Sequence, residues 1–115
     1  MSVFSEAAKN TMLDALTANR VRLHSGDPGA EGTDNELGSL ETATFAAASG
    51  GERSLNPAVA VTGLTANQTV TWFSVWNSTG PAFLGKGAII SGDTTANAAG
   101  EYTLTTATKL QLTDS

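Results

Sequence analysis

The residues best suited to chemistry gather in one stretch, LHSGDPGAEGTDNELG, at residues 23–38. It holds the single histidine of the chain, His24, beside Ser25. Serine, histidine and an acid together suit nucleophilic catalysis, whereas clustered carboxylates suit calcium. The carboxylates in the stretch are Asp27, Glu31, Asp34 and Glu36.

Nucleophilic catalysis does not fit the spacing. His24 and Ser25 are adjacent in a segment expected to be extended, so their side chains point to opposite faces. A nucleophile and its base must lie within hydrogen-bond reach. The chain has no second histidine and no cysteine to replace either of them. We therefore expect no catalytic residue and predict that the protein is not an enzyme.

Metal and phosphate sites fit no better. The acids do not follow the spacing of an EF-hand loop, and zinc would require more histidine or cysteine ligands. GDPGAEG lacks the Lys-Ser/Thr that follows a phosphate-binding loop. We expect no cofactor and no metal, with a weak calcium site left as the alternative. The acids expected to be mostly solvated are Asp27, Glu31, Asp34, Glu36 and Glu41.

What the stretch does predict is turns. GDPG suits a tight turn because proline presets φ and glycine accepts positive φ, and GTDN provides a second turn. The stretch is therefore interpreted as a long ordered surface loop that leaves a strand. Loops of this length in a compact domain tend to make contacts, so the loop points to a partner.

The bulk composition excludes several classes of protein. With 115 residues, 40% of them hydrophobic and 15% charged, the chain suits a single globular domain with a core. The net charge of −5 and the scattered basic residues argue against nucleic-acid binding, and no apolar run is long enough to span a membrane. The first ten residues do not resemble a secretory signal, so we expect folding in a cytosol.

The pattern of residues 4–18 predicts one helix, capped by Ser2 or Ser5. Residues 1–19 as a whole are interpreted as an N-terminal helix or arm. Its apolar stripe has Leu13 at the edge. The helix either packs on its own domain or docks as an arm on another subunit. The expected stripe consists of Ala8, Met12, Ala15 and Leu16.

The rest, 20–115, predicts a β-sandwich. Expected strands are 21–24, 43–49, 56–63, 69–77 and 81–91, the last two forming a hairpin through NSTG. Residues 102–112 alternate with period two and predict one long strand, or two strands bent near Thr106. The fold class is mainly β: an antiparallel sandwich or jelly roll with one N-terminal helix.

The segment 69–77 has apolar residues on both faces. Val70, Trp72 and Trp76 lie on one face, and Phe73 and Val75 lie on the other. Both faces must therefore be covered. The core covers one, and we expect the N-terminal helix or a neighbouring subunit to cover the other, with the subunit favoured for at least one tryptophan.

Several segments together resemble small virion proteins of tailed bacteriophages, often called tail-fibre-like or minor structural proteins. These are LHSGDPGAEGTDNELG, TFAAASGGERSLN, VTWFSVWN, FLGKGAI and AAGEYTLT. In that family a helix precedes an LHTGDPG-type segment, followed by TFAAASGG and a GLWD-type strand. The likeness extends from Leu13 onward. The chain departs from it at GSLETATF (38–45), where relatives have a tyrosine-arginine step, and has SVWN (74–77) in place of GLWD.

The resemblance implies a non-enzymatic structural protein assembled in many copies. Two placements remain open: a capsid-decorating protein that clamps the head lattice, or a tail-fibre or minor tail protein that contacts the host. The chain is short and has neither heptads nor a collagen-like repeat, which favours decoration. We expect virion subunits and copies of itself as partners, no nucleic acid or membrane, and a place on the virion surface after synthesis in the host cytoplasm. The expected partner-contacting residues are Trp72, Trp76, Asp27, Pro28, Asp34 and Glu36.

Overall fold

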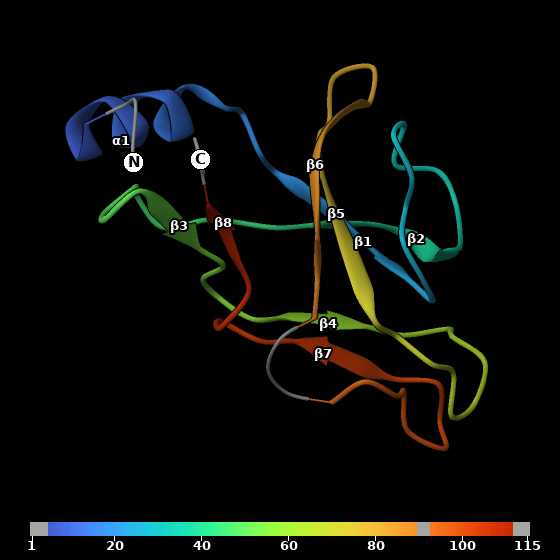
Figure 1. Ribbon diagram of the computed structural model, residues 1–115. Helices are drawn as coiled ribbons and strands as arrows, with labels where there is room; N and C mark the ends of the chain where they lie inside the picture. Colours follow the sequence, from blue (N-terminus) through green and yellow to red (C-terminus); the bar gives the residue numbers. More distant parts are fainter. Residues whose placement is uncertain (1–4, 90–92, 112–115) are drawn as a thin grey trace.

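The computed structural model describes residues 5–89 and 93–111 and has one helix followed by short antiparallel strands (Figure 1). The predicted fold class is confirmed: the fold is mainly β and sandwich-like, with a helix at its N-terminal end. No helix in these two ranges is long and apolar enough to cross a membrane. The elements are α1 (Glu6–Ala15), β1 (Arg20–His24), β2 (Glu36–Thr42), β3 (Glu52–Ser54), β4 (Val59–Val61), β5 (Trp72–Asn77), β6 (Ala82–Ala88), β7 (Tyr102–Leu104) and β8 (Lys109–Gln111).

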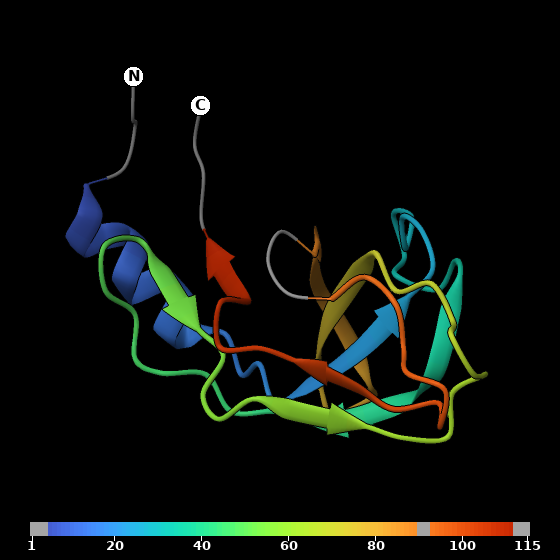
Figure 2. The ribbon, with the colours of Figure 1, turned by 90° about the horizontal axis from the view of Figure 1, so that it is seen from below.

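The largest unit is a four-stranded antiparallel sheet in the order β2-β1-β5-β6. Two ribbons complete the fold, β4 with β7 and β3 with β8. Figure 2 shows β4 and β7 in front of the sheet, with α1 beside β3 at the end of the molecule away from β2. The predicted hairpin of β5 and β6 is therefore present, and the β4–β7 ribbon lies against the sheet as the second layer.

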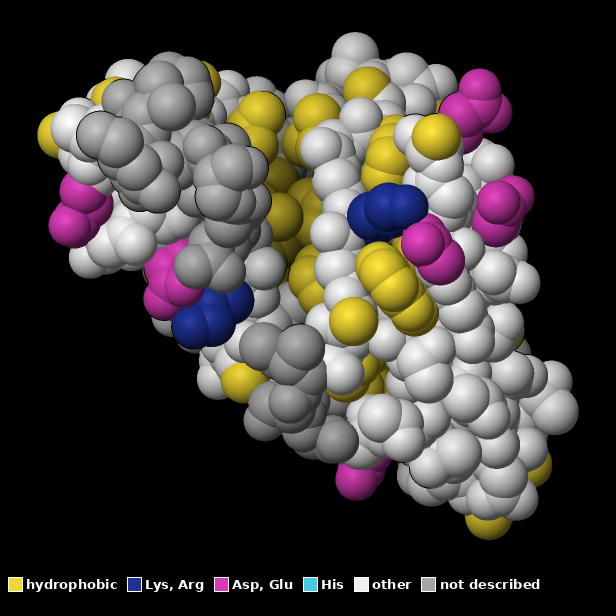
Figure 3. Space-filling view, in the orientation of Figure 1, with side chains coloured by type: hydrophobic (Ala, Val, Ile, Leu, Met, Phe, Trp, Pro, Cys, Tyr) yellow, Lys and Arg dark blue, Asp and Glu magenta, His cyan; other side chains and the backbone are white. Residues whose placement is uncertain are grey.

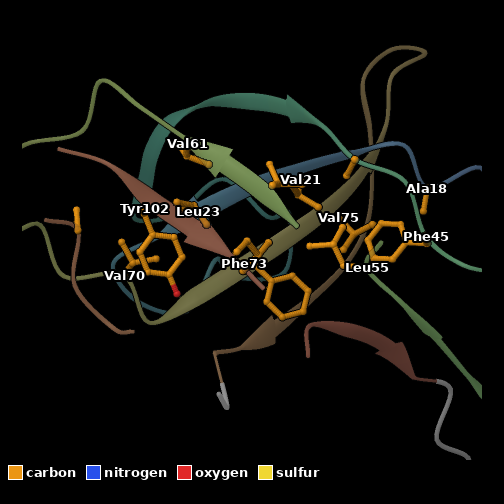
Figure 4. Packing of buried hydrophobic residues seen from close by; sticks show 14 residues of the cluster. Ala18, Val21, Leu23, Phe45, Leu55, Val61, Val70, Phe73, Val75 and Tyr102 are labelled. Carbon is orange, nitrogen blue, oxygen red and sulfur yellow. The ribbon is translucent and has the colours of Figure 1, made fainter. Parts of the chain in front are cut away.

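The core fills the space between the sheet and the ribbons. Leu23 from β1 and Phe73 and Val75 from β5 form one cluster with Val61 and Tyr102 from the β4–β7 ribbon (Figure 4). Burying a side chain such as Leu23 contributes about 1.5–3 kcal/mol. Phe73 and Val75 thus face the core, as predicted, but Val70, expected beside the tryptophans, belongs to this cluster too.

The helix packs by a different face from the one predicted. Met12 and Leu16, both expected in the packed stripe, are 36% and 37% exposed, while Leu13 is buried. Ser5 caps the helix by accepting a hydrogen bond from the Ala8 amide. Ser2 lies outside the described residues. The helix ends at Ala15, because Leu16 has an extended backbone and leads to Ala18 in the core cluster.

Polar contacts explain which helical face is inward. Asn10 Oδ1 accepts from the Gly51 amide and Asp14 Oδ1 from the Ala48 amide. Arg53 of β3 donates to the carbonyls of Leu13 and Leu16, where the helix dipole favours a cation. The helix is therefore packed on its own domain, through a face that hydrophobic periodicity alone does not reveal.

Two strand predictions are wrong. Residues 43–49 form no strand: the Ala46 and Ala48 amides bond to Ser54 and to the Asp14 side chain, and Phe45 makes one isolated bridge. Residues 36–42, expected in the loop and its continuation, form β2. The pairing of β1 with β2 shifts register between Val21 and Leu23, and such an irregularity breaks the period-two pattern that would have indicated a strand.

β3 was not predicted either, because it falls between the predicted strands 43–49 and 56–63. The remaining strands agree with the sequence more closely. Of the two alternatives for 102–112, the bent one is correct: β7 and β8 are separate, and each pairs with a different strand. The outer parts of two predicted strands, 90–91 and Leu112, lie outside the described residues. β4 and β5 occupy shorter parts of the predicted segments 56–63 and 69–77.

Candidate functional site: a loop closed over the second sheet face

The turn-rich stretch is an ordered loop between β1 and β2. Asp27 Oδ1 accepts from the Gly29 amide, and the Asp34 amide donates to the Pro28 carbonyl. Gly29, Gly32 and Asn35 all have positive φ. Proline, glycine and Asx chemistry therefore builds the turns as predicted. We call residues 25–35 the cover loop, because it lies across the face of the sheet opposite the core.

Contacts to β1 and β6 hold the cover loop to that face, and Thr71 Oγ1, just before β5, donates to the Ser25 carbonyl. The Asp34 carbonyl lies 2.8 Å from His24 Nδ1 on β1, and Lys86 Nζ of β6 lies 2.6 Å from Asp27 Oδ1. Gly32 packs against Phe83 of β6: a Cβ at Gly32 would lie 2.6 Å from Phe83 Cε1 and 2.8 Å from Cγ. The Phe83 ring in turn packs on Trp76, with centroids 5.3 Å apart.

Beneath the loop lies a buried hydrogen-bonded network. His24 and Ser74 have no exposed surface, and Trp76 is 8% exposed. His24 Nε2 lies 2.7 Å from Ser74 Oγ, which also lies 2.7 Å from Trp76 Nε1. The sheet register brings the three together, because Arg22 pairs with Ser74 and His24 with Trp72 on neighbouring strands.

Donor and acceptor chemistry assigns every proton of the network. A carbonyl only accepts, so His24 Nδ1 carries a hydrogen and donates to Asp34. Trp76 Nε1 only donates, so the Ser74 oxygen accepts from it. A neutral imidazole then has Nε2 free to accept the Ser74 hydroxyl proton. Each polar group is satisfied, and burial lowers the pKa of His24 in favour of the neutral ring.

The pairing of Ser74 with His24 has the geometry of a nucleophile and its base. It is nevertheless closed to a substrate as it stands, because neither side chain has accessible surface. The Ser74 oxygen is already engaged by Trp76, and a backbone carbonyl rather than a carboxylate orients the imidazole. The arrangement is that of a structural network that fixes a loop. Sequence reasoning missed Ser74, although it is the one polar residue within the apolar run WFSVW.

Four of the six predicted contact residues come together at one end of this face. His24 pairs across the sheet with Trp72 on one side and Glu36 on the other, and the loop adds Asp27 and Asp34. Lys86 lies over the Trp72 ring, 5.8 Å from its centroid, and bridges to Asp27. We call Trp72, Lys86, Asp27, Asp34 and Glu36 the Trp72 patch.

The other two predicted contact residues are buried. The Pro28 side chain is fully buried in the cover loop, and Trp76 lies under Phe83. The expectation that the helix or a neighbouring subunit covers the tryptophans needs correction for Trp76, because the cover loop lies over that face and holds Phe83 against it. For Trp72, a neighbouring subunit stays a prediction. Trp72 alone of the pair is partly open, being only half-buried.

The acids of the region are exposed, as expected, except Glu41, which is half-buried. Two of them are paired: Asp27 with Lys86, and Glu36 with Arg22 at 3.2 Å. The hydrogen bond from Lys86 lowers the pKa of Asp27. Over residues 5–89 and 93–111, no three His, Asp or Glu side chains are arranged to hold a metal ion.

Two other surface features differ in character from the Trp72 patch. A pocket of about 330 Å³ lies beside β4 and β7, with Asp93, Asn97 and Glu101 on its wall. Asn97 donates to the Glu101 carboxylate, and the Tyr102 hydroxyl donates to the Asp93 backbone carbonyl. Figure 3 shows hydrophobic side chains in a hollow between the part carrying α1 and the part carrying β6.

Comparison with known proteins gives no match: no family model, no curated protein and no solved structure is similar to this chain.

Proposed function

We propose that this chain is a non-enzymatic structural protein of a tailed-bacteriophage virion that decorates the capsid. It binds in many copies on the outer head lattice and stabilises it by protein–protein contacts. It contacts major capsid subunits and other copies of itself, and it is made in the host cytoplasm. The residues assigned to the contact are those of the Trp72 patch.

One observation carries the proposal: the cover loop and Trp72 form one surface. The loop is the most specific segment in the resemblance to virion proteins, and it brings Asp27 beside Lys86 and the half-buried Trp72. An aromatic side chain surrounded by charged groups is typical of a protein–protein contact, with the aromatic as anchor and the charges as rim.

The closed Ser74–His24 pair supports the non-enzymatic part of the proposal, because a nucleophile without accessible surface cannot meet a substrate. The shape supports decoration over a tail fibre. The principal extents are 44 × 28 × 24 Å, which suits a compact block on a lattice and provides no shaft. The tail-fibre or minor tail role remains the alternative that the experiment must separate.

The experiment is co-sedimentation of the purified protein with emptied heads and, separately, with isolated tails. We expect saturable binding to heads, which Trp72→Ala weakens by about 2 kcal/mol or more, equivalent to about thirtyfold in Kd. Leu16→Ala is the matched control, because this 37% exposed helical side chain lies outside the patch. Binding to tails alone would move the protein to the tail. A loss with Leu16→Ala and none with Trp72→Ala would move the contact to the helix.

A further inference from the structure

The cover loop is attached to the sheet through a group that changes charge near neutral pH. His24 is the one side chain in the buried network that can take up a proton between pH 5 and 8. His24 lies on β1: its Nδ1 bonds to the Asp34 carbonyl of the loop, and its Nε2 bonds to Ser74 on the neighbouring strand β5.

We propose that His24 is a pH-sensitive latch: proton uptake at Nε2 breaks the hydrogen-bonded chain and releases the cover loop from the sheet. The inference concerns the loop's own equilibrium and holds whether or not the protein decorates a capsid.

Proton counting in the network supplies the mechanism. With Nε2 protonated, its N–H points at Ser74 Oγ, which then accepts from both His24 and Trp76. The Ser74 hydroxyl proton loses the acceptor it had, and a cation stands at a position without solvent. The Nδ1–H bond to the Asp34 carbonyl remains, so the cost falls on the buried charge and on Ser74. Movement of the loop relieves this cost, because it brings water to the imidazole.

The charged groups around His24 do not remove this penalty. Glu36, its neighbour on β2, favours the cation, and Arg22 on β1 opposes it, but the two are paired with each other. On the loop and β6, Asp27 is likewise paired with Lys86. The Asp34 carboxylate is exposed, and its residue meets His24 through the backbone carbonyl. The bond from Nδ1 to that carbonyl favours the cation, but burial is the larger effect and holds the pKa of His24 below its usual value.

The loop is suited to move as a unit. Its internal bonds, such as Asn35 Nδ2 to the Asp27 carbonyl and the Ser25 amide to the Asn35 carbonyl, join loop residues to each other. Its other ties include the exposed Asp27–Lys86 pair, the contact of Gly32 with Phe83 and, at the start of the loop, the hydrogen bond from Thr71 Oγ1 to the Ser25 carbonyl. Release would uncover Phe83 and Trp76.

The test is NMR of the ¹⁵N-labelled protein from pH 8 to pH 4, in which the single histidine gives an unambiguous signal. At pH 8 we expect the Nδ1–H tautomer. Below pH 6.5, the opening constant, measured from hydrogen exchange of the Trp76 indole, which bonds to Ser74 on the sheet, should rise about tenfold per pH unit until the imidazole is protonated. The Val75 amide in the core should keep its protection.

His24→Gln, which keeps a neutral donor and acceptor, should remove the pH dependence of opening. Persistence of the transition at the same midpoint in His24→Gln would overturn the latch. If that variant does not fold, the wild-type protein still decides. Protonation of His24 without loss of protection at the Trp76 indole would show that the loop is not released. Loss of protection at Val75 together with Trp76 would show global unfolding, and either result refutes the proposal.

Discussion

The contact of Gly32 with Phe83 provides the sharpest test of the closed loop. In Gly32→Ala, the new methyl group would meet the Phe83 ring, and alanine would have to adopt a φ of +75°. The left-handed conformation costs about 1–2 kcal/mol, and overpacking adds about 1–3 kcal/mol. We expect a total loss of about 2–5 kcal/mol in the free energy of unfolding.

Gly63→Ala is the matched control for this substitution. Gly63 has a φ of +80° and nothing within 4 Å of an added Cβ, so its variant should lose only the conformational part, about 1–2 kcal/mol. Urea unfolding followed by tryptophan fluorescence measures both variants. Equal losses in the two would refute the reasoning, because they would show that the loop does not press on Phe83.

Three further predictions concern the same region. Ser74→Ala should lower the free energy of unfolding by at least about 2 kcal/mol, because it leaves both His24 Nε2 and Trp76 Nε1 buried without partners. Ser49→Ala, at an exposed serine, should change it by less than about 0.5 kcal/mol, and chemical denaturation measures both variants. Because the pKa of His24 is lowered in the folded state, the unfolded chain binds the proton more readily. The stability that His24 contributes is therefore present above pH 6.5 and is lost as pH falls, with a slope of at most about 1.4 kcal/mol per pH unit. A flat wild-type profile of stability between pH 6.5 and 5, or the same slope in His24→Gln, would contradict this. The exposed acids predict melting temperatures that agree within about one or two degrees with chelator and with calcium, and a rise of many degrees with calcium would show a binding site.

The elements that sequence predicted best are those whose pattern is local. Ser5 caps the helix, the hairpin of β5 and β6 turns through NSTG, and the turns of GDPG follow from proline, glycine and aspartate. Each of these depends on residues close together in the chain, so the sequence carries the whole signal.

The misses depend on partners distant in sequence. The helix packs through Leu13 because Arg53, some forty positions on, bonds to its last turn. β2 was missed because the irregular pairing with β1 breaks its alternation. Residues 43–49 have the composition of a strand, but their amides bond to other elements.

The candidate site was half predictable for the same reason. The run of turns indicated an ordered loop with exposed acids, and the two apolar faces of 69–77 indicated that both are covered. Neither pattern shows that the loop is itself the cover. That relation depends on two contacts between residues far apart in the chain: Ser74 meets His24, and Phe83 meets Gly32. A single sequence does not show which distant residues lie close together.

Hydrogen exchange of the two tryptophan indoles at neutral pH tests the closed loop most directly, with the signals assigned through Trp72→Phe. Trp76 donates its indole N–H to the buried Ser74, while the half-buried Trp72 lies at the edge of the patch. We predict one indole that exchanges slowly, belonging to Trp76, and one that exchanges at a rate near that of free tryptophan, belonging to Trp72. Fast exchange at both indoles would contradict a loop that is closed over the second face of the sheet.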